Sequence, residues 1–233
     1  MSPKDPLTLP EEILLLALHD EKGTTGMESM YQYAIGGAIL AELLMRRRLR
    51  IASDKKKTVQ LTNPKPVGEP VLDDGLTQLM KAKKPAAAQT WVSRFAGIKR
   101  LKHRVAQRLC DRGILEADEK KILLLFSQQI YPEINPEPER EILERLQRAI
   151  FTETDNLDPH TVVLVSLAHS AGLLPMVFDK KELKTRKDRI ERVINGDALG
   201  QATKEAIEAV QAAIMVAVIM PSIIASTTAA TSG

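Results

Sequence analysis

The chain of 233 residues contains a single cysteine, Cys110, and therefore cannot form an intramolecular disulfide. No basic segment followed by an apolar run opens the sequence, so a secretory signal peptide is not expected. The four histidines have no metal-binding spacing, and the sequence has no phosphate loop, no dinucleotide-binding glycine motif and no hydrolase nucleophile elbow. We therefore predict a cytoplasmic protein that holds neither a metal nor a cofactor and is not an enzyme.

Aromatic residues make up only 3% of the chain, whereas hydrophobic residues of all kinds make up 44%. The core must then consist of aliphatic side chains, which favours packed helices over a β-sandwich. An apolar run starts at Ala212 and stops at Pro221, which is well short of the ~20 residues that a membrane-spanning helix needs. We predict that this last helix is buried in the core.

The patterning predicts a mainly α fold, in which a single helical domain over residues 7–221 surrounds the buried C-terminal helix and carries two short β-hairpins. Residues 1–6 are expected to form a short N-terminal arm, and residues 222–233 a flexible tail. The first helix starts at a capping box. In this motif the Thr8 side chain accepts a backbone N–H while Glu11 reaches back to the threonine.

Two stretches of the chain look like copies of one unit. Residues 44–61 and 109–126 each contain the end of a helix, a turn and a predicted hairpin, and prolines and an amphipathic helix follow each of them. We interpret them as an internal duplication with an offset of roughly 65 residues. The helix of the first copy is expected over residues 27–47, and that of the second over residues 98–112, closed by Gly113.

Cationic side chains are concentrated in the second of these helices. Lys99 and Lys102 are three residues apart, so on a helix they would project from the same face and could bind one phosphate group together, with Arg104 close by. The plainer interpretation is a solvated basic face. A separate basic cluster, from Arg46 to Lys57, belongs to the first hairpin. The lysine pair predicts a binding site for a small anionic head group.

The second hairpin has an apolar strand. Residues 122–126 are apolar on both faces, whereas a hairpin on a protein surface normally hides only one. The second face must be covered by the protein's own core, by a neighbouring copy of the chain in a homo-oligomer, or by lipid. A basic pocket beside an apolar hairpin would supply the two signals that a peripheral membrane protein needs. We therefore expect membrane insertion or an oligomer contact through Leu123, Leu124, Leu125 and Phe126.

Several segments together resemble the Golgi phosphoprotein 3 family. They are the first helix with the sequence LTLPEEILLLAL from Leu7, the following EKG turn, AEL from Ala41, RLCDRGIL from Arg108 and LAHS from Leu167. The resemblance covers residues 7–220. It implies a mostly helical domain that binds phosphatidylinositol 4-phosphate on the cytosolic face of Golgi membranes and recruits the tails of glycosyltransferases.

The family's head-group pocket combines an aromatic residue and an arginine near the start of the second helix with two basic residues on a later helix. The resemblance places the two basic residues at Lys99 and Lys102, the aromatic residue at Met27 and the arginine at Gly36. This chain therefore keeps the charges of the later pair and lacks both side chains of the earlier one. The family's membrane-facing hairpin corresponds to residues 118–127.

Two other functions remain open. Helices followed by a hairpin also build winged-helix proteins that bind nucleic acid, and the cluster between Arg46 and Lys57 would lie on the first wing. The helix before that hairpin contains Gly36, Gly37 and Ala41, so it offers few side chains that could read bases. Nucleic acid is therefore the less favoured partner. A purely structural scaffold would bind neither nucleic acid nor anionic phospholipid at a membrane surface.

Overall fold

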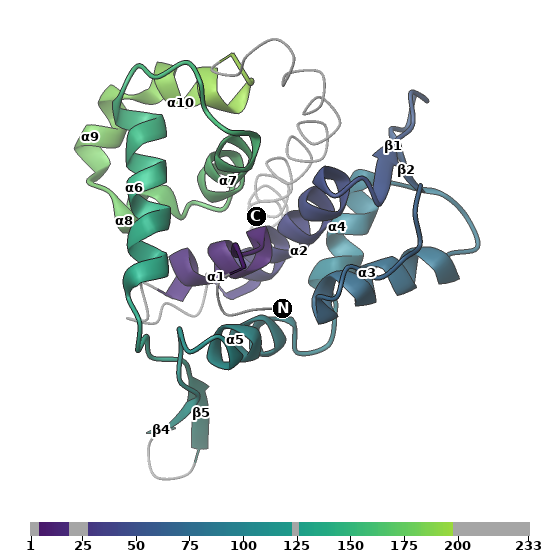
Figure 1. Cartoon of the computed structure of the whole chain (residues 1–233), viewed down its shortest axis with the longest axis horizontal. Coiled ribbons are helices and arrows are strands. Elements are labelled where there is room, and N and C mark those ends of the chain that lie inside the picture. The colour runs from purple at the N-terminus through teal and green to yellow at the C-terminus, as the bar shows by residue number, and fades with distance from the viewer. Residues whose placement is uncertain (1–4, 19–27, 123–125, 198–233) are drawn as a thin grey trace, which may run out of the picture.

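The computed structural model describes residues 5–18, 28–122 and 126–197, and these are mainly α-helical (Figure 1). The elements of the first half are α1 (Leu9–Leu18), α2 (Glu28–Met45), β1 (Leu49–Ile51), β2 (Thr58–Leu61), α3 (Pro70–Lys81), β3 (Ala86–Ala87), α4 (Ala88–Ala96) and α5 (Leu101–Asp111). They are followed by β4 (Asp118–Ile122), β5 (Phe126–Ile130), α6 (Glu137–Phe151), α7 (Pro159–Ser170), α8 (Leu174–Val177), α9 (Lys180–Thr185) and α10 (Lys187–Ile194). The predicted mainly α fold with short hairpins is confirmed. The predicted C-terminal helix lies outside the described residues.

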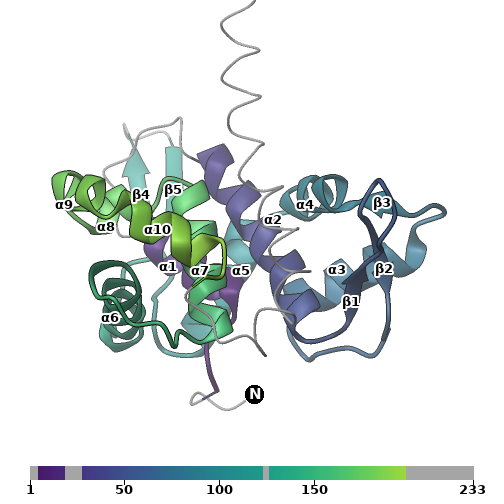
Figure 2. The same ribbon diagram turned by 90° about the horizontal axis from the view of Figure 1, so that it is seen from above.

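Helix α2 forms the centre of the described core. Every residue from position 34 to position 44 is buried, and α1, α3, α4 and α7 pack against this helix. A side chain at Gly36 would begin 2.6 Å from the carbonyl oxygen of Val92 and 2.8 Å from the backbone nitrogen of Ala96. The glycine therefore allows the backbones of α2 and α4 to approach closely. Figure 2 shows that α2 lies between α3, α4 and the first three strands on one side and α6–α10 on the other.

The start of α1 shows half of the predicted capping box. The backbone N–H of Thr8 donates to Oε2 of Glu11 (2.8 Å), as expected. The threonine hydroxyl donates to the same oxygen (2.9 Å), which is a different contact from the backbone N–H that it was predicted to accept. Arg112, which follows α5, pairs with the same carboxylate at 3.3 Å. Glu11 therefore both orders the first turn of α1 and joins it to the end of α5.

The first hairpin is part of a three-stranded antiparallel sheet. Strands β1 and β2 pair with Arg50 opposite Gln60, which confirms the hairpin predicted from the alternating sequence. Strand β3 pairs with the other edge of β2. Its two alanines carry no alternating pattern, so the sequence did not predict this strand.

The second hairpin differs from the prediction in its register. Strands β4 and β5 pair with Asp118 opposite Ile130 and Ile122 opposite Phe126. The prediction of one continuous apolar strand over residues 122–126 is wrong, because Ile122 ends β4 and Phe126 begins β5. Leu123, Leu124 and Leu125 lie outside the described residues.

The two predicted copies share a pattern of backbone hydrogen bonds. After α2, the N–H of Arg48 donates to the carbonyl oxygen of Leu43 (2.9 Å). After α5, the N–H of Ile114 donates in the same way to Leu109 (3.0 Å). In both copies, a backbone N–H thus bonds to the carbonyl oxygen five residues earlier, and this bond closes the end of the helix before the hairpin begins. The same geometry typically ends a helix at a left-handed residue.

The pattern continues beyond each hairpin. Asn63 and Asn135 each donate their N–H, at 3.2 Å, to the carbonyl oxygen of the residue whose own N–H closes the preceding helix, which is Arg48 in the first copy and Ile114 in the second. The side-chain oxygen of each asparagine then accepts the N–H two residues on, from Lys65 at 3.0 Å and from Glu137 at 3.2 Å. These matching bonds support the internal duplication and make the β1–β2 and β4–β5 hairpins corresponding parts of two copies.

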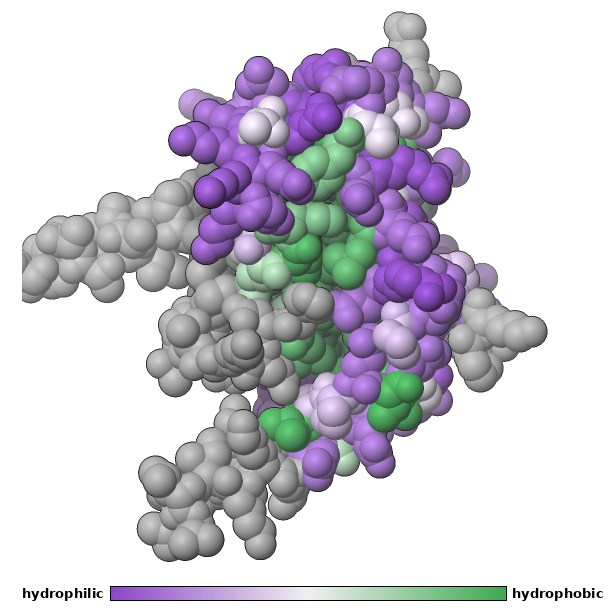
Figure 3. Space-filling model, turned by 90° about the vertical axis from the view of Figure 1, so that its left-hand side faces the viewer, coloured by the Kyte–Doolittle hydropathy of each residue, from purple (hydrophilic) through white to green (hydrophobic). Residues whose placement is uncertain are grey.

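One face of the molecule carries α6, α8 and α9. It shows a strip of apolar surface between polar margins (Figure 3). In these elements Leu143, Met176 and Val177 are partly buried against the core. Phe151 and Phe178 meet edge to face, with ring centroids 5.4 Å apart. This half of the molecule therefore depends on aliphatic and aromatic packing around α6.

Candidate functional site

The two lysines predicted to bind an anion lie in residues 97–102, where α4 turns into α5, and we call this segment the α4–α5 corner. Lys99 is exposed in the turn, and Lys102 is half-buried in the first turn of α5. Arg100, between them, has a left-handed backbone with φ of 55°, so the helix does not extend back to Lys99. The helix predicted over residues 98–112 is present but starts at Leu101, and the expectation that both lysines lie on one helical face is therefore wrong. The lysines belong to one corner but to two elements.

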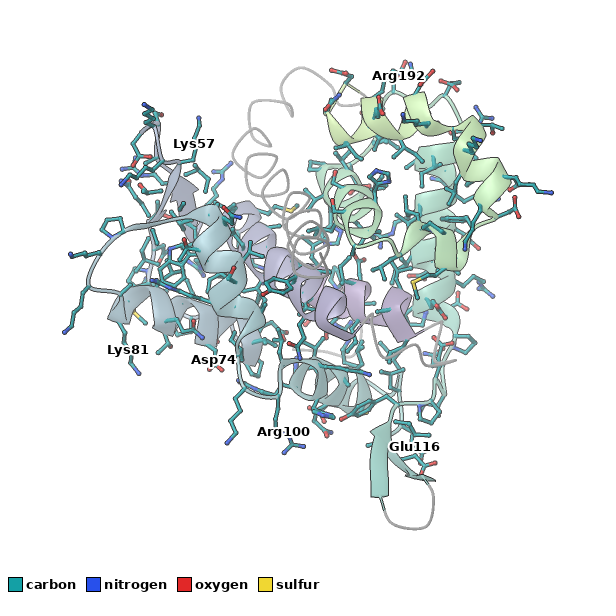
Figure 4. The ribbon with its side chains drawn as sticks, turned by 180° about the vertical axis from the view of Figure 1, so that it is seen from behind. Lys57, Asp74, Lys81, Arg100, Glu116 and Arg192 are labelled. Atoms are coloured by element: carbon teal, nitrogen blue, oxygen red, sulfur yellow. The ribbon has the colours of Figure 1, made fainter. Side chains whose placement is uncertain are left out.

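The corner has further features that suit an anion. No side chain caps the N-terminus of α5, so the positive end of this helix is open next to Lys99 and Arg100. Figure 4 shows Arg100 at the lower edge of the molecule, and its side chain is exposed. The predicted site did not include Arg100, although its charge belongs to the same cationic run of the sequence.

Arg104 has a different environment from the one predicted. Its guanidinium group forms an ion pair with Asp74 of α3 and lies 3.5 Å from the carbonyl oxygen of Pro70. One turn further along α5, Arg108 binds both carboxylate oxygens of Glu69 at 3.1 Å. Glu69 is only 2% exposed. Arg104 and Arg108 therefore hold α5 against α3, and a ligand at Arg104 would have to compete with Asp74.

The two positions that the resemblance placed near the start of the second helix contribute no described side chain to the corner. Gly36 is buried under the end of α4, three residues before Lys99, and has no side chain that could reach a ligand. Met27 lies outside the described residues. The structure thus brings Lys99 and Lys102 to one corner and places Gly36 in a helix contact beneath it.

The corner and the β4–β5 hairpin are attached to the same helix. His103 of α5 is hydrogen-bonded through Nδ1 to the hydroxyl group of Tyr131 (2.8 Å), directly after β5. Figure 4 shows Arg100 and the hairpin, whose base is marked by Glu116, along the same edge of the molecule. The predicted insertion residues 123–125 lie outside the described residues, and of Phe126 only the backbone is described.

A second charged cluster, which the sequence analysis did not single out, is buried between α1, α6 and α7. Glu12 is only 3% exposed, pairs with Arg145 through Oε1, and has Oε2 3.4 Å from Nδ1 of His160. The three residues line a cavity of about 740 Å³. Burial raises the pKa of Glu12 to about 8, and burial also lowers the pKa of His160. Burial therefore opposes the charged form of Glu12, whereas its pairing with Arg145 favours that form.

The described residues offer no group of three or more histidine, cysteine or acidic side chains arranged to hold a metal ion. Within the same part of the chain, no helix is both long enough and apolar enough to cross a bilayer.

Comparison with known proteins gives two findings. The family model described as Golgi phosphoprotein 3 (GPP34) matches residues 9–210. The chain is also similar to the vacuolar protein sorting-associated protein 74 of Eremothecium gossypii, with 27% identity over 213 residues. This alignment covers 77% of the chain and 64% of the relative, so the chain spans just under two thirds of the length of that protein.

Proposed function

Because the chain belongs to the Golgi phosphoprotein 3 family, we propose that it is a peripheral membrane protein without catalytic activity that binds phosphoinositide head groups at the α4–α5 corner. The ligand class is phosphatidylinositol 4-phosphate or a closely similar lipid. The observation that carries the proposal is the placement of Lys99, Arg100 and Lys102 around the uncapped N-terminus of α5. Ammonium and guanidinium groups beside a helix N-terminus form charge-assisted hydrogen bonds with phosphate oxygens.

The β4–β5 hairpin would supply the second attachment. It lies on the same edge of the molecule as Arg100 (Figure 4), so a bilayer that contacts the corner also reaches the hairpin. We propose that residues 123–126 either enter the lipid or contact a second copy of the chain. Shallow insertion of apolar side chains adds to electrostatic attraction, and neither contact alone anchors a peripheral protein stably.

The place of action follows from the same proposal. A phosphoinositide site of this kind would hold the protein on the cytosolic face of a membrane, which is the Golgi membrane in a eukaryotic cell. The tails of glycosyltransferases are proposed as partners from family resemblance alone. The name of the Eremothecium relative refers to vacuolar protein sorting, which agrees with a role in membrane traffic.

The fold disfavours the nucleic-acid alternative at the first hairpin. In a winged-helix protein the helix before the hairpin enters the major groove, and its side chains read base edges. Here that helix is α2, which is buried over residues 34–44. It therefore cannot enter a groove while the core remains intact.

The proposal is tested by reversing both lysine charges. Each basic residue close to an anionic membrane contributes about 1 kcal/mol to binding. We therefore expect the double variant Lys99→Glu with Lys102→Glu to lose at least about tenfold in affinity for phosphatidylinositol 4-phosphate vesicles, measured by co-sedimentation.

The matched control makes the same change in net charge at α9. Lys180→Glu with Lys184→Glu alters two exposed lysines, one turn apart, outside the corner. This variant should bind the vesicles as the unchanged protein does. Equal binding by the corner variant and the unchanged protein would remove the proposed site.

A further inference from the structure

The charge of the protein is concentrated in one part of the fold. Residues 46–100, which we call the basic lobe, contain 14 lysines and arginines but only 4 aspartates and glutamates. Their formal charge is +10, whereas the whole chain carries +3, so the remaining residues carry −7. The basic lobe comprises α3, α4 and the three-stranded sheet, at one end of the long axis (Figure 1). Most of these charges are not explained by the α4–α5 corner.

The turn between β1 and β2 holds the densest group of these charges, and we call Lys55, Lys56 and Lys57 the lysine tip. All three are exposed. The neighbouring acid, Asp54, instead accepts hydrogen bonds from the backbone N–H of Thr58 (3.0 Å) and from its hydroxyl group. No ion pair within the described part of the chain involves the lysine tip.

The lysine tip points away from the proposed docking edge. The β1–β2 and β4–β5 hairpins are corresponding parts of the two copies, and they project toward opposite sides of the molecule (Figures 1 and 4). Figure 4 shows Lys57 at the upper edge and Arg100 at the lower edge. A flat bilayer in contact with Arg100 and the β4–β5 hairpin therefore cannot also touch the tip.

We propose that the lysine tip is a second anion-binding surface, and that it contacts the anionic lipids of a second bilayer while the α4–α5 corner binds the first. The protein then bridges two membrane surfaces. This inference rests on the proposed function, because bridging requires that the corner bind lipid.

The shape of the tip favours a bilayer over an acidic peptide or a nucleic acid. The tip is the end of a projecting hairpin, so it is convex, and it presents ammonium groups that act as compact point charges. Lipids diffuse in the bilayer plane and can gather around a convex cationic cluster without a complementary groove. Clusters of basic residues bind acidic leaflets in this way. The exposed arginines Arg47 and Arg50 flank the tip and add to the same field.

The experiment compares binding with bridging for the full chain. Phosphatidylcholine vesicles that contain phosphatidylserine and phosphatidylinositol 4-phosphate are mixed with the protein. Binding is measured by flotation, and vesicle clustering by turbidity. We expect the unchanged protein to bind and to cluster vesicles. The triple variant Lys55→Gln, Lys56→Gln, Lys57→Gln should bind within about twofold of the unchanged protein and cluster vesicles at least about tenfold less.

Two controls isolate the tip. The variant Lys180→Gln, Lys181→Gln, Lys184→Gln removes the same charge from α9 and should cluster vesicles normally. Sedimentation velocity without lipid should give one oligomeric state for all three proteins. A change of oligomeric state in the tip variant would assign the clustering to self-association and overturn the inference.

The remaining outcomes are equally decisive. Binding without clustering by the unchanged protein, or normal clustering by the tip variant, refutes the bridging role while the proposed function stands. Loss of all binding in the tip variant would make the tip the main lipid contact and would also refute bridging. Absence of any binding by the unchanged protein removes the proposed function and the inference with it. Tip-dependent binding of an RNA oligonucleotide or of polyglutamate, without clustering of vesicles, would assign the tip to a different partner.

Discussion

The carboxyl group of Glu12 is held by the fold in a protonation state that it would not have in water. The group is buried between α1, α6 and α7, and Oε2 has no hydrogen-bond partner among the described residues. Burial opposes the charged form and outweighs the favourable effect of Arg145, so the pKa rises from 4.5 to about 8. Glu42, the neighbouring acid, instead accepts hydrogen bonds from the backbone of Leu9 (2.9 Å) and from Arg46 (2.7 Å). Two buried glutamates in one cluster therefore have different hydrogen-bond partners.

A pH-dependent stability follows for Glu12. Between pH 4.5 and about 8 the folded protein keeps a proton that the unfolded chain releases, so this residue lowers the free energy of unfolding as the pH rises through that range. Glu12→Gln removes the effect. We expect the variant to gain stability relative to the unchanged protein from pH 5 to pH 8, as measured by urea unfolding.

The comparison is Glu144→Gln, which makes the same chemical change at an exposed glutamate of α6. His160 acts in the opposite direction, because its lowered pKa disfavours the folded state as the pH falls below 6.5. It is present in all three proteins. A stability difference for Glu12→Gln that stays constant between pH 5 and pH 8 would contradict the raised pKa.

At the scale of the elements, the contact between α2 and α4 depends on backbone approach. Gly36→Ala would place a methyl group 2.6 Å from the carbonyl oxygen of Val92 and 2.8 Å from the backbone nitrogen of Ala96. Backbone cannot move aside as a flexible side chain can. We expect a loss of about 2–3 kcal/mol in the free energy of unfolding, measured with urea.

Gly75→Ala is the matched variant in the same core. There a methyl group would meet only side-chain atoms, the nearest being Cγ2 of Ile39 at 3.2 Å. Small adjustments can relieve such a contact, so the cost should be clearly smaller than at Gly36. Equal losses in the free energy of unfolding at the two positions would show that backbone atoms do not limit how closely α2 and α4 approach.

The elements also show what the sequence could and could not predict. Apolar spacing and end signals predicted α2 and the end of α5 at Gly113 closely, because these features are local. The predicted start of α5 lies three residues too early because Arg100 is left-handed, a conformation that an arginine adopts rarely and that the sequence does not signal. Strand β3 was missed because two alanines have no pattern of their own and pair only because β2 lies beside them.

The sequence likewise predicted only part of the candidate site. Lys99 and Lys102 were identified by charge and spacing, which the sequence shows directly. The pairing of Arg104 with Asp74 was not predicted, because 30 residues separate the two and only the fold brings α3 against α5. Local patterns therefore predicted which charges exist, and long-range packing decides which of them are already paired.

At the scale of the whole molecule, two ion pairs tie the basic lobe to α5. Arg108 binds Glu69 with two hydrogen bonds of 3.1 Å, and Arg104 pairs with Asp74. Glu69 is almost fully buried, so removing its partner leaves a charge with little access to water. These pairs therefore fasten α3 of the basic lobe to α5.

Arg108→Ala should therefore destabilise the protein by about 3 kcal/mol, since a buried pair that loses one partner leaves an uncompensated charge. Urea unfolding measures the loss. Arg140→Ala breaks an ion pair with Glu137 in which both side chains are more than half exposed, and it should cost at most about 1 kcal/mol. Similar losses in the two variants would show that the burial of Glu69 does not increase the contribution of its ion pair to stability.

The basic lobe has a consequence before any contact is made. Residues 46–100 carry +10 at one end of the long axis, and the other described residues carry −6, so the described part of the protein has a large electric dipole although the net charge is small. In the field of an anionic surface this dipole experiences a torque that rotates the positive end forward during the approach. Encounters are therefore oriented in advance, and mobile salt ions weaken this guidance because they screen charges beyond about 10 Å at 0.1 M.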